Sequence, residues 1–204
     1  MEIKRIESKF LGSNVFIVID RKECLIIDAG VEIDKVLKEV GDNKVVGILL
    51  THGHYDHCAY IKEYCKKFDC PVFINQNGKK TMGSKKLNYS GERSFRTNDK
   101  FVFLDEDCKI KRGHFNVCYF HTPGHSPCCA CYLIKKDLFA GDTAFYVGVG
   151  RIDLLESDRE EMINSLEKIE KIKFETLHSG HERDSLFEEQ MRNLSAYKKF
   201  LSRK

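Results

Sequence analysis

Ionisable side chains are concentrated in residues 48–61, ILLTHGHYDHCAYI. Directly after a run of aliphatic residues, three histidines and one aspartate fall within six positions: His52, His54, Asp56 and His57. His52 and His54 lie two positions apart just beyond an expected strand, so in extended backbone both side chains project to the same side. Two imidazoles on one side can bind one metal ion, and Asp56 and His57, at the start of the next helix, can point toward a second. The spacing predicts a metal-binding loop rather than a solvated one.

Three more candidate ligands each follow an apolar run that ends in a turn of small residues. His125 lies in VCYFHTPGHSP, Asp142 follows LFAG, and His181 ends FETLHSGH. Loops at strand ends can be brought to one point by a rigid sheet, so these residues can join the first group. The combined five histidines and two aspartates are donors suited to a pair of divalent cations. Because the set contains no cysteine, a closed structural zinc site is disfavoured and a coordination position is left for water.

The surrounding sequence predicts the elements that position these residues. Two β-branched runs at 14–20 and 24–30, joined by a short turn, predict a hairpin, and apolar spacing predicts a helix over 31–40. Further strands are expected at 45–50, 71–74, 101–104, 117–120, 131–134 and 138–140, with a helix at 61–68. Residues 75–98 are polar and predict a long loop with some local helix.

Two terminal helices are expected near the end of the sequence. Ser157 with Glu160, and Ser185 with Glu188, resemble capping boxes that open them. The order of strands, helix, strand, helix, further strands and two helices predicts a layered α/β fold. With 204 residues and no repeat or linker, residues 1–204 are expected to form a single domain.

Composition narrows the classes of partner. Lysine and arginine total 34 against 31 acidic residues, and the net charge of +3 is spread along the chain, so no nucleic-acid partner is expected. We expect no membrane partner and a cytoplasmic location, because no signal peptide or spanning segment is evident. The nine cysteines lack the regular spacing of a secreted scaffold and are interpreted as reduced thiols. The oligomeric state is left open.

The motifs that carry a resemblance to a known family are THGHYDH, HTPGHS, GDT with its continuation GVGRIDL, and SGH. Their order resembles that of the metallo-β-lactamase superfamily, and within it the short, single-domain glyoxalase II-like hydrolases. The resemblance implies an αββα sandwich, two mixed β-sheets flanked by helices, with metals at one edge. It implies that one metal is held by His52, His54 and His125, the other by Asp56, His57 and His181, and that Asp142 bridges them. Aspartate at position 142 resembles the glyoxalase branch rather than the lactam-cleaving enzymes. Histidine at position 54 argues against an oxygen-reducing diiron site.

This resemblance implies a metal-dependent hydrolase in which a hydroxide bridging two divalent metals attacks the carbonyl of a small-molecule thioester, similar to a hydroxyacylglutathione, or of an ester. Two divalent cations, two carboxylates and one hydroxide leave a net charge of about +1, which favours an anionic transition state. We expect zinc, with iron or manganese as alternatives. Asp56 is the catalytic candidate, because it can accept a proton from the attacking water. Asp28 can orient a ligand imidazole or can simply occupy a turn.

Several alternatives remain open at this stage. A persulfide dioxygenase uses similar motifs with a single iron held by two histidines and one aspartate, and a lactonase is a further hydrolytic option. Only 23 residues follow His181, so a helical C-terminal domain that holds glutathione is not expected. Tyr146 and Arg151 can line the substrate cleft, although a packed tyrosine and a surface arginine are equally compatible with the sequence.

The cysteines near His125 can be functional or can simply pack in the core. Three thiols near His125, those of Cys128, Cys129 and Cys131, can form a redox sensor or an extra metal site, but they lack CxxC spacing. We favour buried packing for all three. Cys65 and Cys70 are interpreted in the same way.

Overall fold

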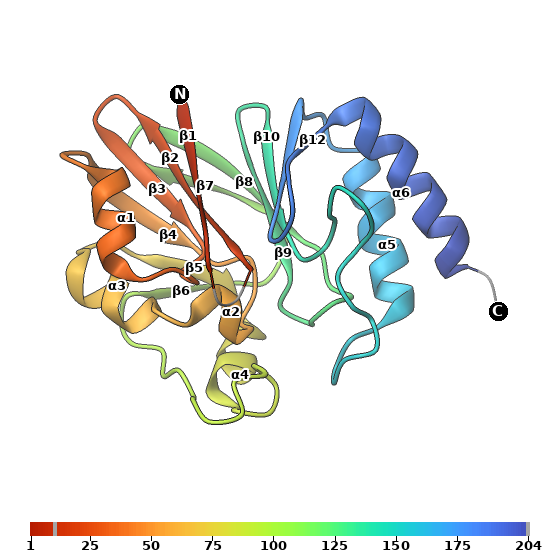
Figure 1. The fold of residues 1–204 in the computed structure, drawn as a ribbon, viewed down its shortest axis with the longest axis horizontal. Helices are drawn as coiled ribbons and strands as arrows, with labels where there is room; N and C mark the ends of the chain where they lie inside the picture. Colours follow the sequence, from red (N-terminus) through yellow and green to blue (C-terminus); the bar gives the residue numbers. More distant parts are fainter. Residues whose placement is uncertain (10–11, 203–204) are drawn as a thin grey trace.

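Two six-stranded β-sheets lie face to face, and helices cover the outer face of each sheet (Figure 1). The computed structural model describes residues 1–9 and 12–202. From one side to the other, the layers are helix, sheet, sheet and helix. Both sheets are mixed, so the αββα sandwich expected from the sequence is confirmed. The division of the chain into domains stays a prediction.

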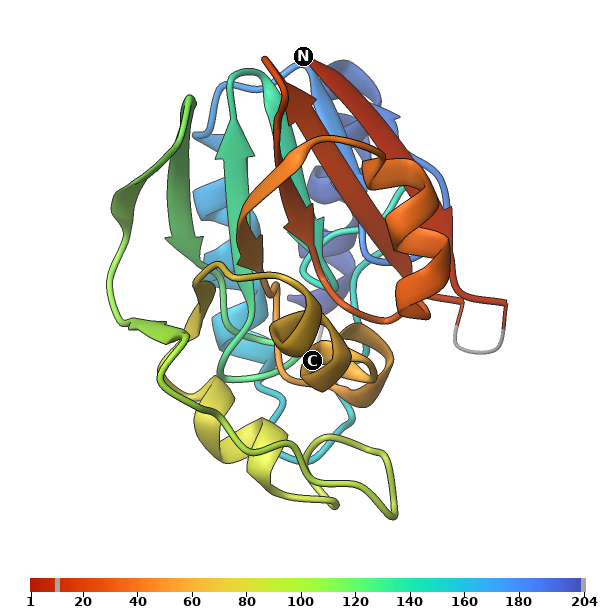
Figure 2. The same cartoon turned by 90° about the vertical axis from the view of Figure 1, so that its left-hand side faces the viewer.

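The first sheet has the strand order β1-β2-β3-β4-β5-β6. Its strands are β1 (Glu2–Glu7), β2 (Asn14–Asp20), β3 (Glu23–Ile27), β4 (Lys44–Leu49), β5 (Val72–Asn75) and β6 (Phe101–Leu104). The first three pair antiparallel, whereas β3 to β6 run parallel. Parallel neighbours require crossover connections, and α1 (Ile33–Val40), α2 (Tyr55–Cys58), α3 (Ile61–Lys67) and α4 (Gly78–Gly83) lie in these connections. Figure 2 shows α1, in orange, lying across the outer face of this sheet.

The second sheet has the order β12-β11-β10-β9-β8-β7. Its strands are β7 (Cys108–Arg112), β8 (Phe115–His121), β9 (Ala130–Ile134), β10 (Asp137–Gly141), β11 (Thr176–Ser179) and β12 (Ser185–Leu186). β10 and β11 are parallel and are connected through α5 (Arg159–Glu170), while the other neighbours pair antiparallel. α6 (Phe187–Leu201) follows β12 and packs beside α5 on the outer face (Figure 1).

Buried apolar side chains fill the interfaces between these layers. Between the sheets, residues such as Phe16, Leu25, Val117 and Phe139 form one cluster. A second cluster joins the first sheet to α1 and α3, and a third joins the second sheet to α5 and α6. Because apolar burial on both faces holds each sheet in place, the loops that leave the strand ends start from fixed positions.

The expected cap of α5 was wrong by one residue. The side chain of Asp158, not Ser157, accepts a hydrogen bond from the helix, at 3.0 Å from the Glu161 backbone N–H. The Ser157 hydroxyl donates instead to the backbone carbonyl of Leu154, at 2.8 Å, so it serves the preceding turn. Serine and aspartate can both cap a helix, but the Ser157 hydroxyl is used by the turn that begins at Leu154, so Asp158 is the cap.

The expected capping box of α6 was also wrong by one residue. The expected pair was Ser185 with Glu188. In the structure the backbone N–H of Leu186 donates instead to the carboxylate of Glu189, at 3.2 Å. Ser185 lies in β12, and its hydroxyl donates to the Gln190 side chain at 2.7 Å. A strand residue therefore occupies the position that the sequence pattern assigned to the cap.

Three short strands of the structure and one short helix bear on the segments expected from the sequence. β1, β7 and β12 were not expected, whereas α4 is the local helix expected within 75–98. Among the described residues, no helix has the length and apolar character needed to cross a membrane.

Candidate metal centre

Loops from both sheets carry the seven candidate ligands to one edge of the sandwich. His52 and His54 follow β4, Asp56 and His57 lie in the short helix α2, and the other three residues follow β8, β10 and β11. Among the described residues, two groups have ligand atoms within 4.8 Å of one another. One group is His52, His54 and His125, and the other is Asp56, His57, Asp142 and His181. The structure therefore brings all seven residues together.

Asp142 lies between the two groups. Its Oδ2 atom is 3.4 Å from Nε2 of His125 in the first group and 3.5 Å from Nε2 of His181 in the second. Its Oδ1 atom is 3.2 Å from Nε2 of His57. One carboxylate can thus contact a ligand of each group, which is the position that a bridging ligand would need.

Hydrogen bonds from the outer ring nitrogen orient three of the imidazoles. Nδ1 of His57 lies 2.8 Å from Oδ2 of Asp28. Nδ1 of His125 lies 2.9 Å from the Arg151 backbone carbonyl, and Nδ1 of His181 lies 2.9 Å from the Gly12 carbonyl. Each partner is an acceptor, so Nδ1 carries the hydrogen and Nε2 is left facing the centre. This is the arrangement that metal-binding histidines commonly show.

His52 provides the test of whether the site fits a metal. Its ring is fully buried, and its Nδ1 atom lies 3.2 Å from the Thr51 hydroxyl. Thr51 in turn donates to Asp28 from its backbone N–H and from its hydroxyl, at 2.7 and 2.8 Å. Nε2 of His52 is buried without a hydrogen-bond partner. An unpaired buried acceptor is costly, and a cation at Nε2 would remove that cost, so the residues present fit a metal.

Burial keeps His52 and His54 of the first group neutral. Burial, together with the nearby His57, holds the pKa of His52 well below its usual range. Burial, with His125 as the next cause, lowers the pKa of His54 to about 3. Neutral imidazoles have the free lone pair that metal binding requires.

The second group combines carboxylates with protonated imidazoles when no cation is present. Burial disfavours charge on His181, but contacts with Asp142 and Asp56 raise its pKa to about 10. Burial likewise opposes charge on His57, and the surrounding carboxylates, Asp142 first, hold its pKa well above the usual value. Burial raises the pKa of Asp142, but His57 and His181 hold it well below the usual value. The two carboxylates therefore stay ionised, and a cation that displaced the protons of His57 and His181 would take over their place as counter-charge to Asp56 and Asp142.

Gly180 allows the second group to pack closely. A Cβ atom at this position would lie 2.3 Å from Oδ1 of Asp142 and 2.8 Å from Cε1 of His57. A larger residue would displace the carboxylate that lies between the groups.

A cleft of about 410 Å³ opens above the centre. Its walls include the described residues Tyr55, Tyr89, Phe145, Leu154 and Arg151, alongside several of the candidate ligands. The Tyr89 ring lies edge-on to His54, with ring centroids 5.1 Å apart. The cleft therefore offers largely apolar and aromatic walls to a substrate, as small-molecule sites commonly do.

Of the two residues named in advance for the cleft, only Arg151 lines it. Its guanidinium forms two hydrogen bonds of 2.9 Å with Asp153. Tyr146 is not among the residues that line the cleft, because its ring packs against Arg183, whose guanidinium carbon lies 3.7 Å from the ring centroid. Tyr89 lies in the long polar loop expected at 75–98, but the polar pattern of that loop does not predict that it lies over the metal centre.

The cysteines near His125 are packing residues. Cys128, Cys129 and Cys131 are buried and free, and burial raises the pKa of each thiol. Cys128 also accepts a hydrogen bond of 3.3 Å from the Gly53 backbone N–H, within the HGH segment. Buried thiols with raised pKa values are unreactive, which agrees with the packing interpretation.

The comparisons with known proteins define the class. The chain matches the family model described as the metallo-beta-lactamase superfamily over residues 8–181. The protein therefore belongs to the metallo-beta-lactamase superfamily. A probable metallo-hydrolase, YqgX, from Bacillus subtilis (strain 168) is 35% identical over 191 residues, covering 89% of this chain and 90% of that protein. The chain is thus a metallo-hydrolase superfamily member with a candidate metal site.

Solved structures agree with this assignment. The B3 metallo-beta-lactamase BLEG-1 superposes with a TM-score of 0.87 at 26% identity, covering 99% of this chain and all of that chain. TTHA1623, whose crystal structure is in a di-iron-bound form, gives a TM-score of 0.80 at 25% identity, covering 93% and 98% of the two chains.

Proposed function

We propose that this protein is a binuclear metal-dependent hydrolase that cleaves a small-molecule thioester, of the hydroxyacylglutathione type, or an ester. The observation that carries the proposal is the convergence of seven ligand side chains in two groups, with Asp142 in contact with both. His52, His54 and His125 would hold one cation. Asp56, His57 and His181 would hold the other, and Asp142 would bridge them.

Two divalent cations, zinc first and iron or manganese as alternatives, would supply Lewis acidity and lower the pKa of a coordinated water. The di-iron form of TTHA1623 supports iron as an option for this chain. The chain itself supplies the alignment: Asp28, the Arg151 carbonyl and the Gly12 carbonyl fix three imidazoles with Nε2 inward. Imidazoles held in this way need not lose rotational freedom when they bind a cation, which raises the affinity of the site for the metal.

Asp56 is the residue proposed to move a proton. Its Oδ2 atom lies 3.1 Å from Nε2 of His181. Asp56 and Asp142 both line the cleft, but the Asp56 side chain is 29% exposed and that of Asp142 only 7%, so Asp56 is the more accessible carboxylate. Burial raises its pKa, but the charges of His57 and the contact with His181 lower it below the usual value. A carboxylate that stays ionised and borders the cleft can accept a proton from the attacking water.

The cleft walls indicate the substrate class. Tyr55, Tyr89, Phe145 and Leu154 suit an acyl group or an apolar thiol or alcohol portion. Arg151 is the only lysine or arginine among the described lining residues, and it is already paired with Asp153. Glutathione, a tripeptide thiol with two carboxylates, would therefore find few cationic partners in this cleft. The proposal is that the enzyme selects its substrate by the acyl group rather than by strong recognition of glutathione.

A mononuclear iron dioxygenase is less well supported. Such a centre needs two histidines and one aspartate, whereas the described residues offer a second group of four potential ligands beside the first. The proposal therefore favours hydrolysis, with a lactone as a further ester-type substrate.

The test is hydrolysis of S-lactoylglutathione, a simple acyl ester and a lactone by protein loaded separately with zinc, manganese and iron, with metal content measured in each sample. We expect about two metal ions per chain and turnover of at least one substrate that is lost on chelation. Asp142→Asn should reduce both metal content and turnover, whereas Asp34→Asn, an exposed change on α1, should alter neither.

Two outcomes would contradict the proposal. One is a folded, metal-loaded protein that hydrolyses none of the three substrates. The other is an Asp142→Asn protein that keeps two metals and full turnover. Oxygen uptake in the presence of glutathione persulfide, with a single iron bound, would instead identify the dioxygenase alternative.

A further inference from the structure

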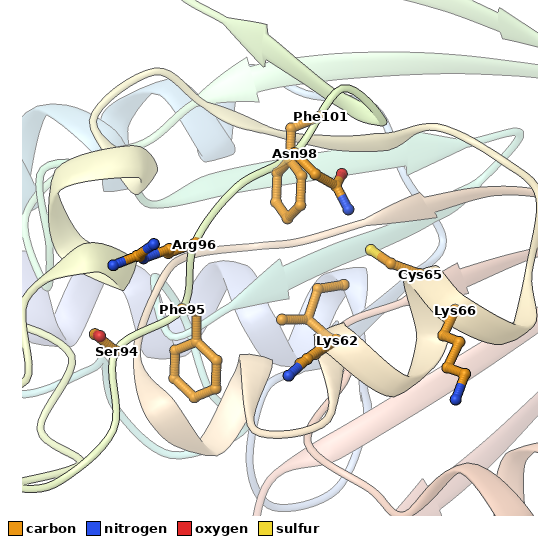
Figure 3. A pocket seen from close by; sticks show the side chains of 9 residues that line it. Lys62, Cys65, Lys66, Ser94, Phe95, Arg96, Asn98 and Phe101 are labelled. Carbon is orange, nitrogen blue, oxygen red and sulfur yellow. The ribbon is translucent and has the colours of Figure 1, made fainter.

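A second cavity lies between α3 and the segment that leads to β6. Its volume is about 580 Å³, larger than that of the metal-site cleft. Figure 3 shows the side chains that surround it, with Cys65 and the two lysines on α3 and Phe95, Asn98 and Phe101 on the opposing segment. None of the residues that line it is a candidate metal ligand. The metal chemistry therefore leaves this cavity unexplained.

The floor of the cavity is apolar. Ile61, Cys65, Phe95 and Phe101 line it, and Ile61, Cys65 and Phe101 belong to the buried core between the first sheet and its helices. Burial raises the pKa of Cys65, so its thiol acts as an apolar contact. An alkyl or aryl group would remove this surface from water.

The charges around the cavity have one sign. Lys62, Lys66 and Arg96 are among the lining residues, and no described lining residue is acidic. Among the described residues, these three cations form no ion pair with a carboxylate, in contrast to nearby Lys100, which pairs with Asp69 at 3.2 Å. In Figure 3 Arg96 and Lys66 both extend away from Phe95 and Phe101, whereas the Lys62 amine ends beside the Phe95 ring. Lys62 is therefore the nearest candidate for contact, with Lys66 one helical turn further along α3. Unpaired cations beside an apolar floor match a ligand with an anionic head and an apolar tail.

The cavity shares a wall with the metal-site cleft. Phe95 lines the cavity and Tyr55 lines the cleft, and their rings stack with centroids 6.1 Å apart and an interplanar angle of 27°. The backbone N–H of Phe95 donates to the Met82 carbonyl at 2.9 Å, which fixes this wall against α4. A reporter at position 95 would therefore sense the cavity from a well-anchored position.

We propose that this cavity is a second ligand site, separate from the metal centre, that binds a single-tailed amphipathic anion. The tail lies on Ile61, Cys65, Phe95 and Phe101, and the head group contacts Lys62 and Lys66. The proposal does not depend on the hydrolase activity, because neither lysine lies in the metal-site cleft.

The chain contains no tryptophan, so Phe95→Trp introduces a single fluorescent reporter. The experiment titrates this protein with decanoate and decyl phosphate, below the concentrations at which they form micelles, and with decanol and decyltrimethylammonium. We expect saturable emission changes with the anions and binding at least tenfold weaker for the neutral and cationic compounds. Shortening decanoate to octanoate should weaken binding by up to about fifteenfold, because two methylene groups are lost. Comparing the two anions identifies the preferred head group.

Charge reversal provides the specific control. Lys62→Glu with Lys66→Glu should weaken decanoate binding at least tenfold. Lys38→Glu with Lys67→Glu, which makes the same change in net charge at exposed positions outside the cavity, should leave binding within twofold. Calorimetric titration of the same lysine variants with Phe95 retained repeats the comparison if Phe95→Trp disturbs folding. Absence of saturable binding, or equal binding by both double variants, would overturn the proposal.

Discussion

At the scale of single residues, the candidate centre depends on partners that are not ligands. Thr51 and Asp28 form a small network behind His52 and His57: Thr51 donates twice to Asp28, and Asp28 lies 2.8 Å from His57. Asp28 adopts a backbone φ of +64°, a region that asparagine and aspartate tolerate better than most residues. A short side chain with a charge at this unusual backbone position thus orients an imidazole of the second group.

We predict that Asp28→Asn weakens metal binding. Asparagine keeps the size of the side chain and tolerates the same backbone conformation, but it removes the negative charge beside His57. Loss of such a partner typically weakens metal affinity by about 10–100-fold. Competition with a chelating dye measures this, and Asp34→Asn serves as the control for loss of one exposed carboxylate. Unchanged affinity for both metals would show that Asp28 has no orienting role.

Gly180 supports a second prediction at this scale. In Gly180→Ala, the new methyl group would overlap Oδ1 of Asp142, at 2.3 Å, so the carboxylate must move. We expect metal content to fall and turnover to drop by about 100-fold, the usual cost of displacing a reacting centre by roughly 1 Å.

Gly83→Ala is the matched control, because a Cβ atom there has no neighbour within 4 Å. Unfolding curves of both variants separate loss of the site from loss of the fold. A Gly180→Ala protein with normal metal content and turnover would mean that the described positions of Asp142 and His57 are not those of the active enzyme.

At the scale of elements, the sequence predicts the buried strands and the loops that carry the candidate ligands, but it does not predict the edge strands of the two sheets. β4 and β5 are buried runs with strong apolar patterns. β1 and β7, at the edges of their sheets, are mostly exposed or half-buried, so their charged sequences EIKRIE and CKIKR carry little strand signal. The pairing of a neighbouring strand, rather than local pattern, makes these segments strands.

The cleft shows the same limit. The candidate ligands could be found because histidine and aspartate after a buried strand are chemically distinctive. Tyr89 and Leu154 could not be assigned to the cleft, because their positions depend on how two long loops cross the sheet edge. A long-range hydrogen bond joins these loops: the backbone N–H of Leu155, the residue after Leu154, donates to the Tyr89 hydroxyl. Local spacing contains no information about such a contact.

The cap of α5 gives a prediction for an element. Because Asp158 accepts the hydrogen bond from the Glu161 N–H, Asp158→Ala should lower the free energy of unfolding by about 1 kcal/mol. Ser157→Ala should cost less, because its hydroxyl donates to the preceding turn and caps no helix N–H. Urea unfolding of the two variants measures the difference. The reverse order would restore Ser157 as the cap.

At the scale of the whole molecule, the candidate centre joins the two sheets. His52 and His54 follow a strand of the first sheet, and His125, Asp142 and His181 follow strands of the second. An apolar interface that contains none of the candidate ligands already holds the two sheets together. A cation bound by residues from both sheets would nevertheless add a link between them at this edge.

This arrangement predicts that metal binding stabilises the whole fold. A ligand that binds only the folded state, at about 100 times its Kd, adds about 2.7 kcal/mol to the free energy of unfolding. For a chain of this size the midpoint of thermal unfolding should rise by about 5–10 °C. Thermal scans with zinc and with a chelator measure the shift. Asp142→Asn should reduce this shift, and it should also lower the midpoint in chelator, because His57 and His181 lose a buried counter-charge. Equal midpoints with and without metal, in protein shown to bind it, would mean that the cations bind the unfolded chain equally well and that the two sheets gain no link from them.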